Sequence, residues 1–371
     1  MDLSFINMPR VAAKIYHQKL GSGFPLFSSA KSKNYLLSCD SIRVSDVWSF
    51  LNYTIRVSKH KTTGHPYTTD QQKYLLDLLA QAEYFYKTAE GAPIKSQPLL
   101  YYYSFMNLTK IAINLNKFEG STKKYVHGIT ESINAASKLA NVEIMMWQSK
   151  GSKISISEYL LKLLEDPTPA YAPSGSGNAV SVKVMDLLRD CIGVNRTYSE
   201  MCNVAEHFYK VRTIECYSQR NGLHYVGEVY DCDDQAMNDL NAQGYNVSKS
   251  GDKYCLNAVS YVRTTPSPTI AEWHMLSKTM RNQGLWSYTD GVGYKLYISP
   301  IAAKMSSPAI IYHIMFFFGS ITRYHPDLFD SIMTAKEYWL VSEFLKTQPQ
   351  QFLYYMVSYI NGAEVLFSKQ V

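Results

Sequence analysis

The sequence predicts an α+β fold, in which a mainly helical domain built on a helical hairpin carries an inserted antiparallel β-sheet module. Two observations predict it. Apolar residues recur at helical spacing before residue 205 and after residue 300. From Lys210 onward the period changes, and polar and apolar residues alternate as in strands. The 371 residues are enough for one large domain or two interleaved domains, without a stabilising disulfide or metal.

The change of period divides the chain into four segments. They are an irregular basic N-terminal segment (1–44), the first part of the helical domain (45–204), the inserted sheet module (205–300) and the second part of the helical domain (301–371). Pro167 to Asn178 is rich in Pro, Gly and Ser, which is typical of a linker or a mobile loop.

Ser96 to Asn116 predicts the central helix of the protein. It is apolar almost all round, so Tyr101, Phe105 and Leu108 are expected in the core together with Ala112 and Leu115. One polar line remains, because its members are spaced i, i+4, i+7 and i+11 and so stack on one face. This line consists of Tyr103, Asn107, Lys110 and Asn114. It either reaches solvent or lines a site.

The other helices follow from caps and apolar spacing. We expect them from Ser45 to Val57, over 70–89 (capping box Thr69 with Gln72), 130–140, 157–167, 179–191, 198–209 (capping box Thr197 with Glu200), 233–242, 308–324, 334–346 and 349–360. Gly91 and Pro93 turn the second of these back into the central helix as an antiparallel hairpin. Strands are expected over 142–147, 210–217, 223–230, 254–263, 285–288 and 294–299, with Arg220-Asn-Gly222 as a hairpin turn.

The composition is low in charge, at 18%, and high in tyrosine, with 30 residues. Tyrosine joins apolar area to a polar tip, so the excess predicts either a tyrosine-rich core or a surface that meets a partner. The net charge of +6 comes from residues 1–61, which hold nine basic and three acidic groups, while the remainder is balanced. This segment is a candidate contact for nucleic acid, a membrane surface or an acidic partner, although its charges are dispersed.

The cysteines form neither a CxxC pair nor a Cys/His cluster at zinc spacing, so we predict reduced thiols and no metal site. The N-terminus lacks the pattern of a signal peptide, and the most apolar stretch, Pro308 to Ile321, is too short to span a bilayer. A cytoplasmic protein without membrane insertion is expected. No cofactor motif is present, and no glycine-rich phosphate loop, HExxH, GxSxG or PD-(D/E)xK pattern indicates a reaction.

Three stretches resemble the YaaC-like proteins of bacteria. They are Pro98 to Lys110, His127-Gly128, and Ser320 to Pro326, and the similarity runs from about Trp48 to Val365 with no counterpart over 165–300. The resemblance implies a bacterial cytoplasmic protein and no particular reaction. It marks as shared positions Tyr103, Asn107, Lys110, His127, Gly128, Arg323 and Tyr324.

The first candidate site is a ligand-binding one. If the C-terminal apolar helix packs on the central one, Arg323 joins Lys110 and His127, beside Tyr103 and Asn107, and the three basic groups favour a phosphate or carboxylate. The alternative is structural: Arg323 neutralises its own helix C-terminus, and Lys110 bonds a backbone carbonyl.

The second candidate is catalytic. Arg220 and His224 resemble the Arg-polar…His motif with which the helical HEPN ribonucleases bind and cleave RNA, but here the pair lies on a hairpin turn and is one residue too close. The pair Arg10 and His17 has the right spacing but lacks a partner helix. The simpler interpretation of Arg220 and His224 is a turn with two solvated side chains.

These observations favour a non-catalytic interaction subunit of a bacterial cytoplasmic assembly, with a homo-oligomer or another protein as partner. Antiviral defence is one such setting, although no residue indicates it. The alternative hypothesis is a HEPN-like RNA-cleaving or nucleotide-binding protein.

Overall fold

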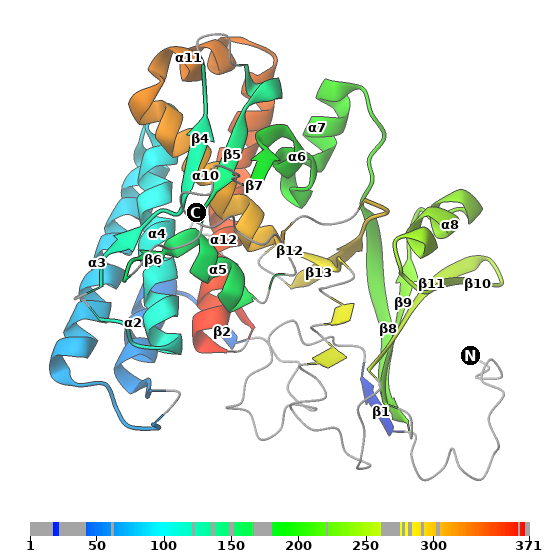
Figure 1. Cartoon of the computed structure of the whole chain (residues 1–371). Coiled ribbons are helices and arrows are strands. Elements are labelled where there is room, and N and C mark those ends of the chain that lie inside the picture. The colour runs from blue at the N-terminus through cyan, green and yellow to red at the C-terminus, as the bar shows by residue number, and fades with distance from the viewer. Residues whose placement is uncertain are drawn as a thin grey trace.

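The computed structural model describes most of the chain. The described residues are 18–21, 42–60, 63–120, 123–134, 138–147, 152–164, 166, 180–219, 222–260, 275–276, 279–280, 284–290, 293–301, 305–362 and 364–367. They form the predicted α+β fold, mainly helical with an antiparallel sheet (Figure 1). Most of the basic N-terminal segment and the Pro167 to Asn178 stretch lie outside the described residues.

The helices are α2 (Val47–Val57), α3 (Thr69–Gly91), α4 (Gln97–Asn116), α5 (Ile156–Leu164), α6 (Val184–Arg189), α7 (Asn195–Cys202), α8 (Asp234–Ala242), α10 (Ser307–Tyr324), α11 (Pro326–Thr334) and α12 (Glu337–Asn361), with 3₁₀ turns η1 (Leu139–Asn141) and η2 (Ile192–Val194). The predicted capping box of Thr197 with Glu200 is wrong, because α7 already begins at Asn195 and its N-cap, Val194, makes no side-chain bond. For α2 and α3 the capping residues lie one position from those predicted. Asp46 caps α2, and Thr68 with Gln71 forms the capping box of α3.

The main sheet has the order β10-β11-β9-β8-β13-β12, and β1 also pairs with β8. Its strands are β1 (Gln18–Gly21), β8 (Tyr209–Gln219), β9 (Gly222–Val229), β10 (Val247–Ser250), β11 (Lys253–Ser260), β12 (Trp286–Thr289) and β13 (Tyr294–Ile298). Smaller sheets join β4 (Ile129–Ser132), β5 (Glu143–Met146) and β7 (Val180–Lys183); β3 (Tyr125–Val126) and β6 (Ile154–Ser155); and β2 (Ile42–Val44) and β14 (Val365–Phe367). The last two pairs are parallel.

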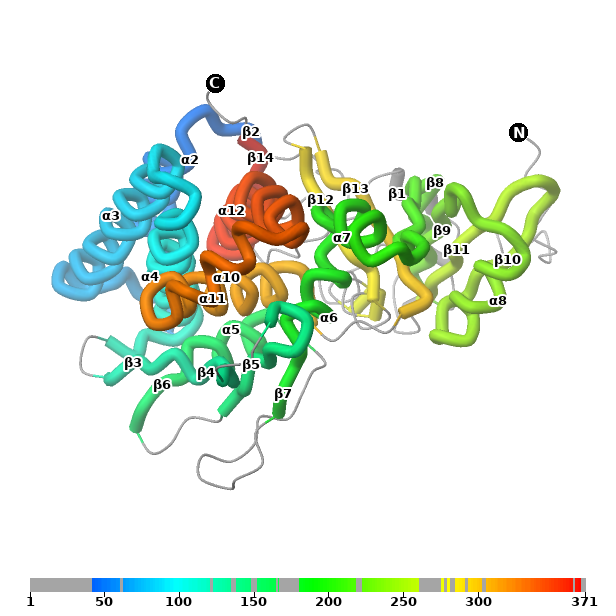
Figure 2. The backbone as a smooth tube through the Cα atoms, turned by 90° about the horizontal axis from the view of Figure 1, so that it is seen from above, coloured from blue at the N-terminus to red at the C-terminus, as the bar shows by residue number. Residues whose placement is uncertain are grey.

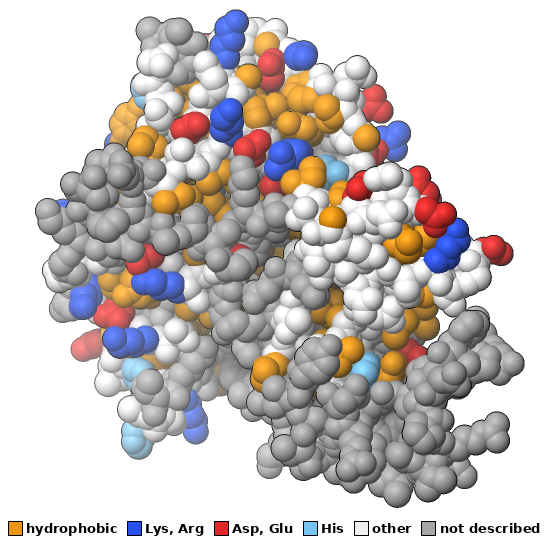
Figure 3. All heavy atoms as spheres, turned by 45° about the vertical axis from the view of Figure 1, so that its right-hand side comes forward, with side chains coloured by type: hydrophobic (Ala, Val, Ile, Leu, Met, Phe, Trp, Pro, Cys, Tyr) orange, Lys and Arg blue, Asp and Glu red, His pale blue; other side chains and the backbone are white. Residues whose placement is uncertain are grey.

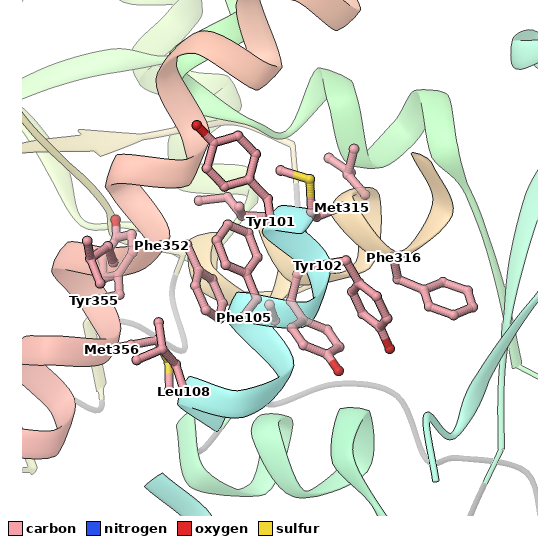
Figure 4. Packing of buried hydrophobic residues seen from close by; sticks show 14 of the residues in the cluster. Tyr101, Tyr102, Phe105, Leu108, Met315, Phe316, Phe352, Tyr355 and Met356 are labelled. Atoms are coloured by element: carbon pink, nitrogen blue, oxygen red, sulfur yellow. The ribbon is translucent and has the colours of Figure 1, made fainter. Parts of the chain in front are cut away.

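The predicted central helix, α4, is buried along most of its length. Its expected core residues are all buried, and it packs on α3, α10 and α12 (Figure 2). Phe105 stacks on Phe352 of α12 with ring centroids 4.0 Å apart, and Tyr102 meets Phe316 of α10 edge-on at 5.4 Å (Figure 4). The expected contact between the central helix and the apolar C-terminal helix is therefore confirmed.

A glycine sets the distance between α4 and α10. A Cβ atom at Gly319 would lie 3.3 Å from Cβ of Tyr102 and 3.4 Å from Cα of Leu99. Because contacts this short are tighter than most Cβ atoms make, a larger residue at this position would push the two helix backbones slightly apart.

The sheet has its own core and is tied to the helices by α12. Alternate residues of its strands, among them Leu223, Tyr225 and Leu256, form a separate buried cluster. The amide of Gln351 on α12 donates to the carbonyl of Thr289 (2.6 Å) and accepts from its N–H (3.0 Å). These bonds hold the end of β12 against the helical core.

The prediction was wrong in the segments between the main elements. Residues 130–140, expected to be helical, contain strand β4, in which Ile129 pairs with Met146 of β5 and is buried. The helix expected over 179–191 begins as strand β7, and the one expected over 198–209 ends at Cys202, where Asn203 adopts a left-handed conformation. In the segments that form β4 and β7, pairing with β5 outweighed the weak local helix propensity.

The C-terminal helices also differ from the prediction. Helix α11 was not expected, and the two helices predicted over 334–346 and 349–360 form one helix, α12, which continues through Pro349. An internal proline costs a helix about 3 kcal/mol. Burial of Phe344 and Leu345 before it and of Phe352 and Leu353 after it offsets that cost.

Phe105 provides a test of the central contact. Replacing this fully buried ring with alanine (Phe105→Ala) removes its stacking on Phe352 and should lower the free energy of unfolding by about 3–5 kcal/mol. Urea denaturation measures the change. The matched control, Tyr84→Ala at an exposed position of α3, should change stability by no more than about 0.5 kcal/mol. Equal effects of the two variants would contradict the central role of α4.

His313 of α10 is a buried titratable group. Its Nδ1 donates to the Ala309 carbonyl at 2.7 Å, so Nε2 lacks a proton and accepts from Oγ of Ser157 at 2.7 Å. Burial of the ring lowers the His313 pKa to about 4.

The unfolded chain therefore binds a proton on His313 more readily than the folded one, and stability should fall as pH drops from about 6.5 towards 4. We expect a loss on the order of 2 kcal/mol between pH 7 and pH 5 from this residue. His313→Leu should reduce that slope in denaturation measured across pH, whereas His65→Gln at an exposed position should leave it unchanged. An unchanged slope in His313→Leu would contradict this account.

Candidate functional site

A pocket of about 260 Å³ opens between α4, β4 and the C-terminal end of α10. Tyr102 and Tyr103 line it from α4, His127 from the turn before β4, Glu131 from β4 and Arg323 from α10. Three of the five predicted ligand-binding residues, Tyr103, His127 and Arg323, thus line one pocket.

The turn that carries His127 requires glycine at the next position. Gly128 has φ +76°, and a Cβ atom there would lie 1.7 Å from Oγ of Ser155. Only glycine combines this backbone conformation with so close an approach. The turn between β3 and β4 therefore holds His127 against α4.

Opposite charges surround the His127 ring. Its Nδ1 hydrogen-bonds the hydroxyl of Tyr102 at 2.5 Å, and its ring lies 6.0 Å from that of Phe316. Burial lowers the His127 pKa, the positive charges of Lys110 and Arg323 lower it further, and the carboxylate of Glu131 opposes them. Two cations and one anion therefore act on the same imidazole.

Arg323 lies at the rim of the pocket. Its Nη1 donates to the hydroxyl of Tyr103 at 3.2 Å, and its guanidinium carbon is 4.9 Å from the Tyr324 ring centroid. It forms no ion pair with any described residue. The last turn of α10 favours a positive charge at this position, in keeping with the structural interpretation.

Lys110 and Asn107 lie near the pocket without lining it. The ammonium of Lys110 is 5.6 Å from the Tyr125 ring, burial lowers its pKa, and it has no acidic partner among the described residues. Asn107 is buried and donates to Gln81 of α3 at 3.4 Å. Lys110 therefore contributes charge from behind the pocket, while Asn107 ties α4 to α3.

The acidic wall of the pocket was not predicted from the sequence. Glu131 accepts a hydrogen bond from Oγ of Ser320 at 2.7 Å, and Nε2 of His325 lies 3.9 Å from the same oxygen. Ser320 and His325 belong to a stretch noted in the sequence. The sequence pattern predicts a helix at Glu131, and nothing in that pattern indicates that this residue faces the same pocket as Arg323.

The second candidate pair is not brought together in the described residues, because Arg220 lies outside them. His224 lies on strand β9, not on a helix, and its ring stacks on that of the cross-strand residue Tyr217 at 4.8 Å with the planes 5° apart. Arg10 and His17 also lie outside the described residues. The strand geometry departs from the helical HEPN arrangement.

Charge on the described surface is mixed. On the face shown in Figure 3, the described basic and acidic side chains are interspersed. Among the described residues, no group of three or more His, Cys, Asp and Glu side chains could hold a metal ion. None of the described helices has the length and apolar character that crossing a membrane requires.

The fold and the pocket together define an α+β protein with a helical core and a pocket of mixed charge. A family model described as YaaC-like Protein matches residues 25–360. The chain therefore belongs to the YaaC-like family. No curated protein and no solved structure matches it.

The charges around His127 predict opposite effects of two variants. Lys110→Gln removes a positive charge and should raise the His127 pKa, whereas Glu131→Gln removes a negative charge and should lower it. Titration of the His127 ring by NMR measures both shifts. Lys95→Gln, an exposed lysine paired with Asp330, serves as the control and should cause none. Shifts of the same sign in the first two variants would contradict the arrangement described.

Proposed function

We propose that this YaaC-like protein is an interaction subunit of a bacterial cytoplasmic assembly, and that its pocket recognises a carboxylate or phosphate group of the partner. The observation that carries the proposal is that Arg323 and Lys110 have no acidic partner among the described residues, although both act on His127. The described cysteines Cys191, Cys202, Cys216, Cys232 and Cys255 form no disulfide with one another, which supports a reducing compartment.

The partly buried ammonium of Lys110 has no counter-ion among the described residues, which is costly, and an anion bound near it recovers part of that cost. Arg323 is suited to this role because a guanidinium offers a planar fork of donors that matches a carboxylate or phosphate. Lys110 adds positive charge from behind the pocket, where its ammonium group is half buried and less screened by solvent.

Tyrosine at the rim supports an interaction role. Tyr101, Tyr102, Tyr312 and Tyr354 are buried, so the core accounts for part of the tyrosine excess. The surface is different: Tyr324 at the pocket is 60% exposed, and Tyr84 of α3 is 67% exposed.

Ring contacts lead from Tyr84 through Phe85 to Tyr103, with centroids 5.8 Å and 5.3 Å apart. Exposed aromatic residues beside an arginine are the side chains that dominate protein interfaces. The partner is accordingly a protein, either another subunit or a second copy of this chain. An antiviral role is not part of the proposal, because no described residue points to it.

Photo-crosslinking tests this function. A photoreactive amino acid in place of Tyr324 should crosslink a protein in cells, and Arg323→Gln should reduce the yield by roughly tenfold or more, because a charge-assisted hydrogen bond is lost. The same amino acid in place of Ile214, on the sheet, is the matched control and should show no dependence on Arg323.

Crosslinking at position 324 that does not depend on Arg323 would contradict the proposal. RNA cleavage by the purified protein that His224→Ala abolishes would favour the HEPN-like alternative instead.

A further inference from the structure

We propose that the pocket takes a zwitterion, namely a free α-amino acid with an apolar side chain. This inference goes beyond the proposed function and concerns the same pocket, where a free amino acid would compete with the anionic group of a partner for Arg323. It adds that the ligand carries an ammonium group together with its carboxylate.

The two walls of the pocket carry opposite charges that do not neutralise each other. Arg323 and Glu131 both line it, yet they form no ion pair within 4.0 Å, and Arg323 instead donates to Tyr103. Two opposite charges in so small a space would pair directly if their side chains met. A ligand with both charges satisfies the guanidinium and the carboxylate at once.

A simple anion fits this pocket less well. Bound beside Arg323, it would also face the carboxylate of Glu131, whose side chain is only 15% exposed, and like charges at short range repel each other. Glu131 already accepts a bond from Ser320 through Oε1, which fixes its carboxylate against the wall. An ammonium group removes the repulsion and finds an acceptor already in place.

The remaining walls suit an apolar side chain. Leu99, Ile129 and Phe316 line the pocket, and Gly319 adds no side chain of its own. A volume of about 260 Å³ leaves room for a small molecule of the size of an amino acid. The volume and the apolar lining of the pocket therefore both fit an amino acid with an apolar side chain.

The experiment compares three matched molecules by calorimetry on the full chain. They are L-phenylalanine, 3-phenylpropanoate, which lacks the ammonium group, and 2-phenylethylamine, which lacks the carboxylate. L-leucine with 4-methylpentanoate and isoamylamine forms a second, aliphatic set. The amino acid should bind at least roughly tenfold more tightly than either analogue in one of the two sets, because each analogue loses one charge-assisted contact.

Two variants separate the charges. In Glu131→Gln, the amino acid should no longer bind more tightly than the carboxylate analogue. In Arg323→Gln, it should no longer bind more tightly than the amine. Lys87→Gln, an exposed lysine paired with Glu83, is the control and should change neither. Thermal denaturation of each variant without ligand confirms that the fold is retained.

Equal binding of an amino acid and its carboxylate analogue would overturn the zwitterion proposal and leave an anion pocket, as the proposed function requires. No binding of any of the six compounds to the wild type would also overturn it. Crosslinking at position 324 that does not depend on Arg323 is a separate outcome, so failure of the proposed function is distinguishable from failure of this inference.

Discussion

The contact between α4 and α10 is the constraint on which the rest of the structure depends. The two helices touch where Gly319 leaves no side chain, so that Tyr102 and Leu99 lie against the α10 backbone. Because the helices meet there, the last turn of α10 and the first half of α4 end on the same side of the molecule. That placement brings Arg323 to Tyr103 and forms one wall of the pocket.

Aromatic packing makes this contact rigid. Phe105 lies between α4 and α12, and Tyr102 lies between α4 and α10, so one helix face anchors two others (Figure 4). A side chain in a packed core can move only if its neighbours move with it. The hydroxyl of Tyr102 is therefore held where it can bond His127, and a core residue becomes the support of a polar site. The same tyrosine serves the apolar core with its ring and the pocket with its tip.

The pocket differs from an ordinary surface ion-pair cluster in how its charges are distributed. Surface lysines elsewhere, such as Lys87 and Lys95, pair with a nearby carboxylate. Arg323 at the pocket and Lys110 behind it remain without such partners among the described residues, although Glu131 is close enough to affect His127. The residues that line the pocket come from three stretches of the sequence, and the local pattern of one stretch does not specify the others.

Local periodicity was sufficient to predict the central helix, its hairpin with α3, helix α10 and the main strands of the sheet. The reason is that periodicity shows which face of a segment is buried. It failed for β4, where a segment of weak helical pattern pairs with β5, and for α12, where burial on both sides of Pro349 keeps one helix intact. Lys110 and Arg323 were singled out because each lies on an apolar helix, and His127 because glycine follows it in a loop.

By itself, then, the sequence determined the fold class and the identity of the central helix, and it singled out His127 and Arg323, which line the pocket. Only the tertiary structure decided that Glu131 faces the pocket and that Asn107 does not line it. The physical reason is that the direction of a side chain on a short strand depends on its pairing register, and that register is set by a neighbour distant in the sequence.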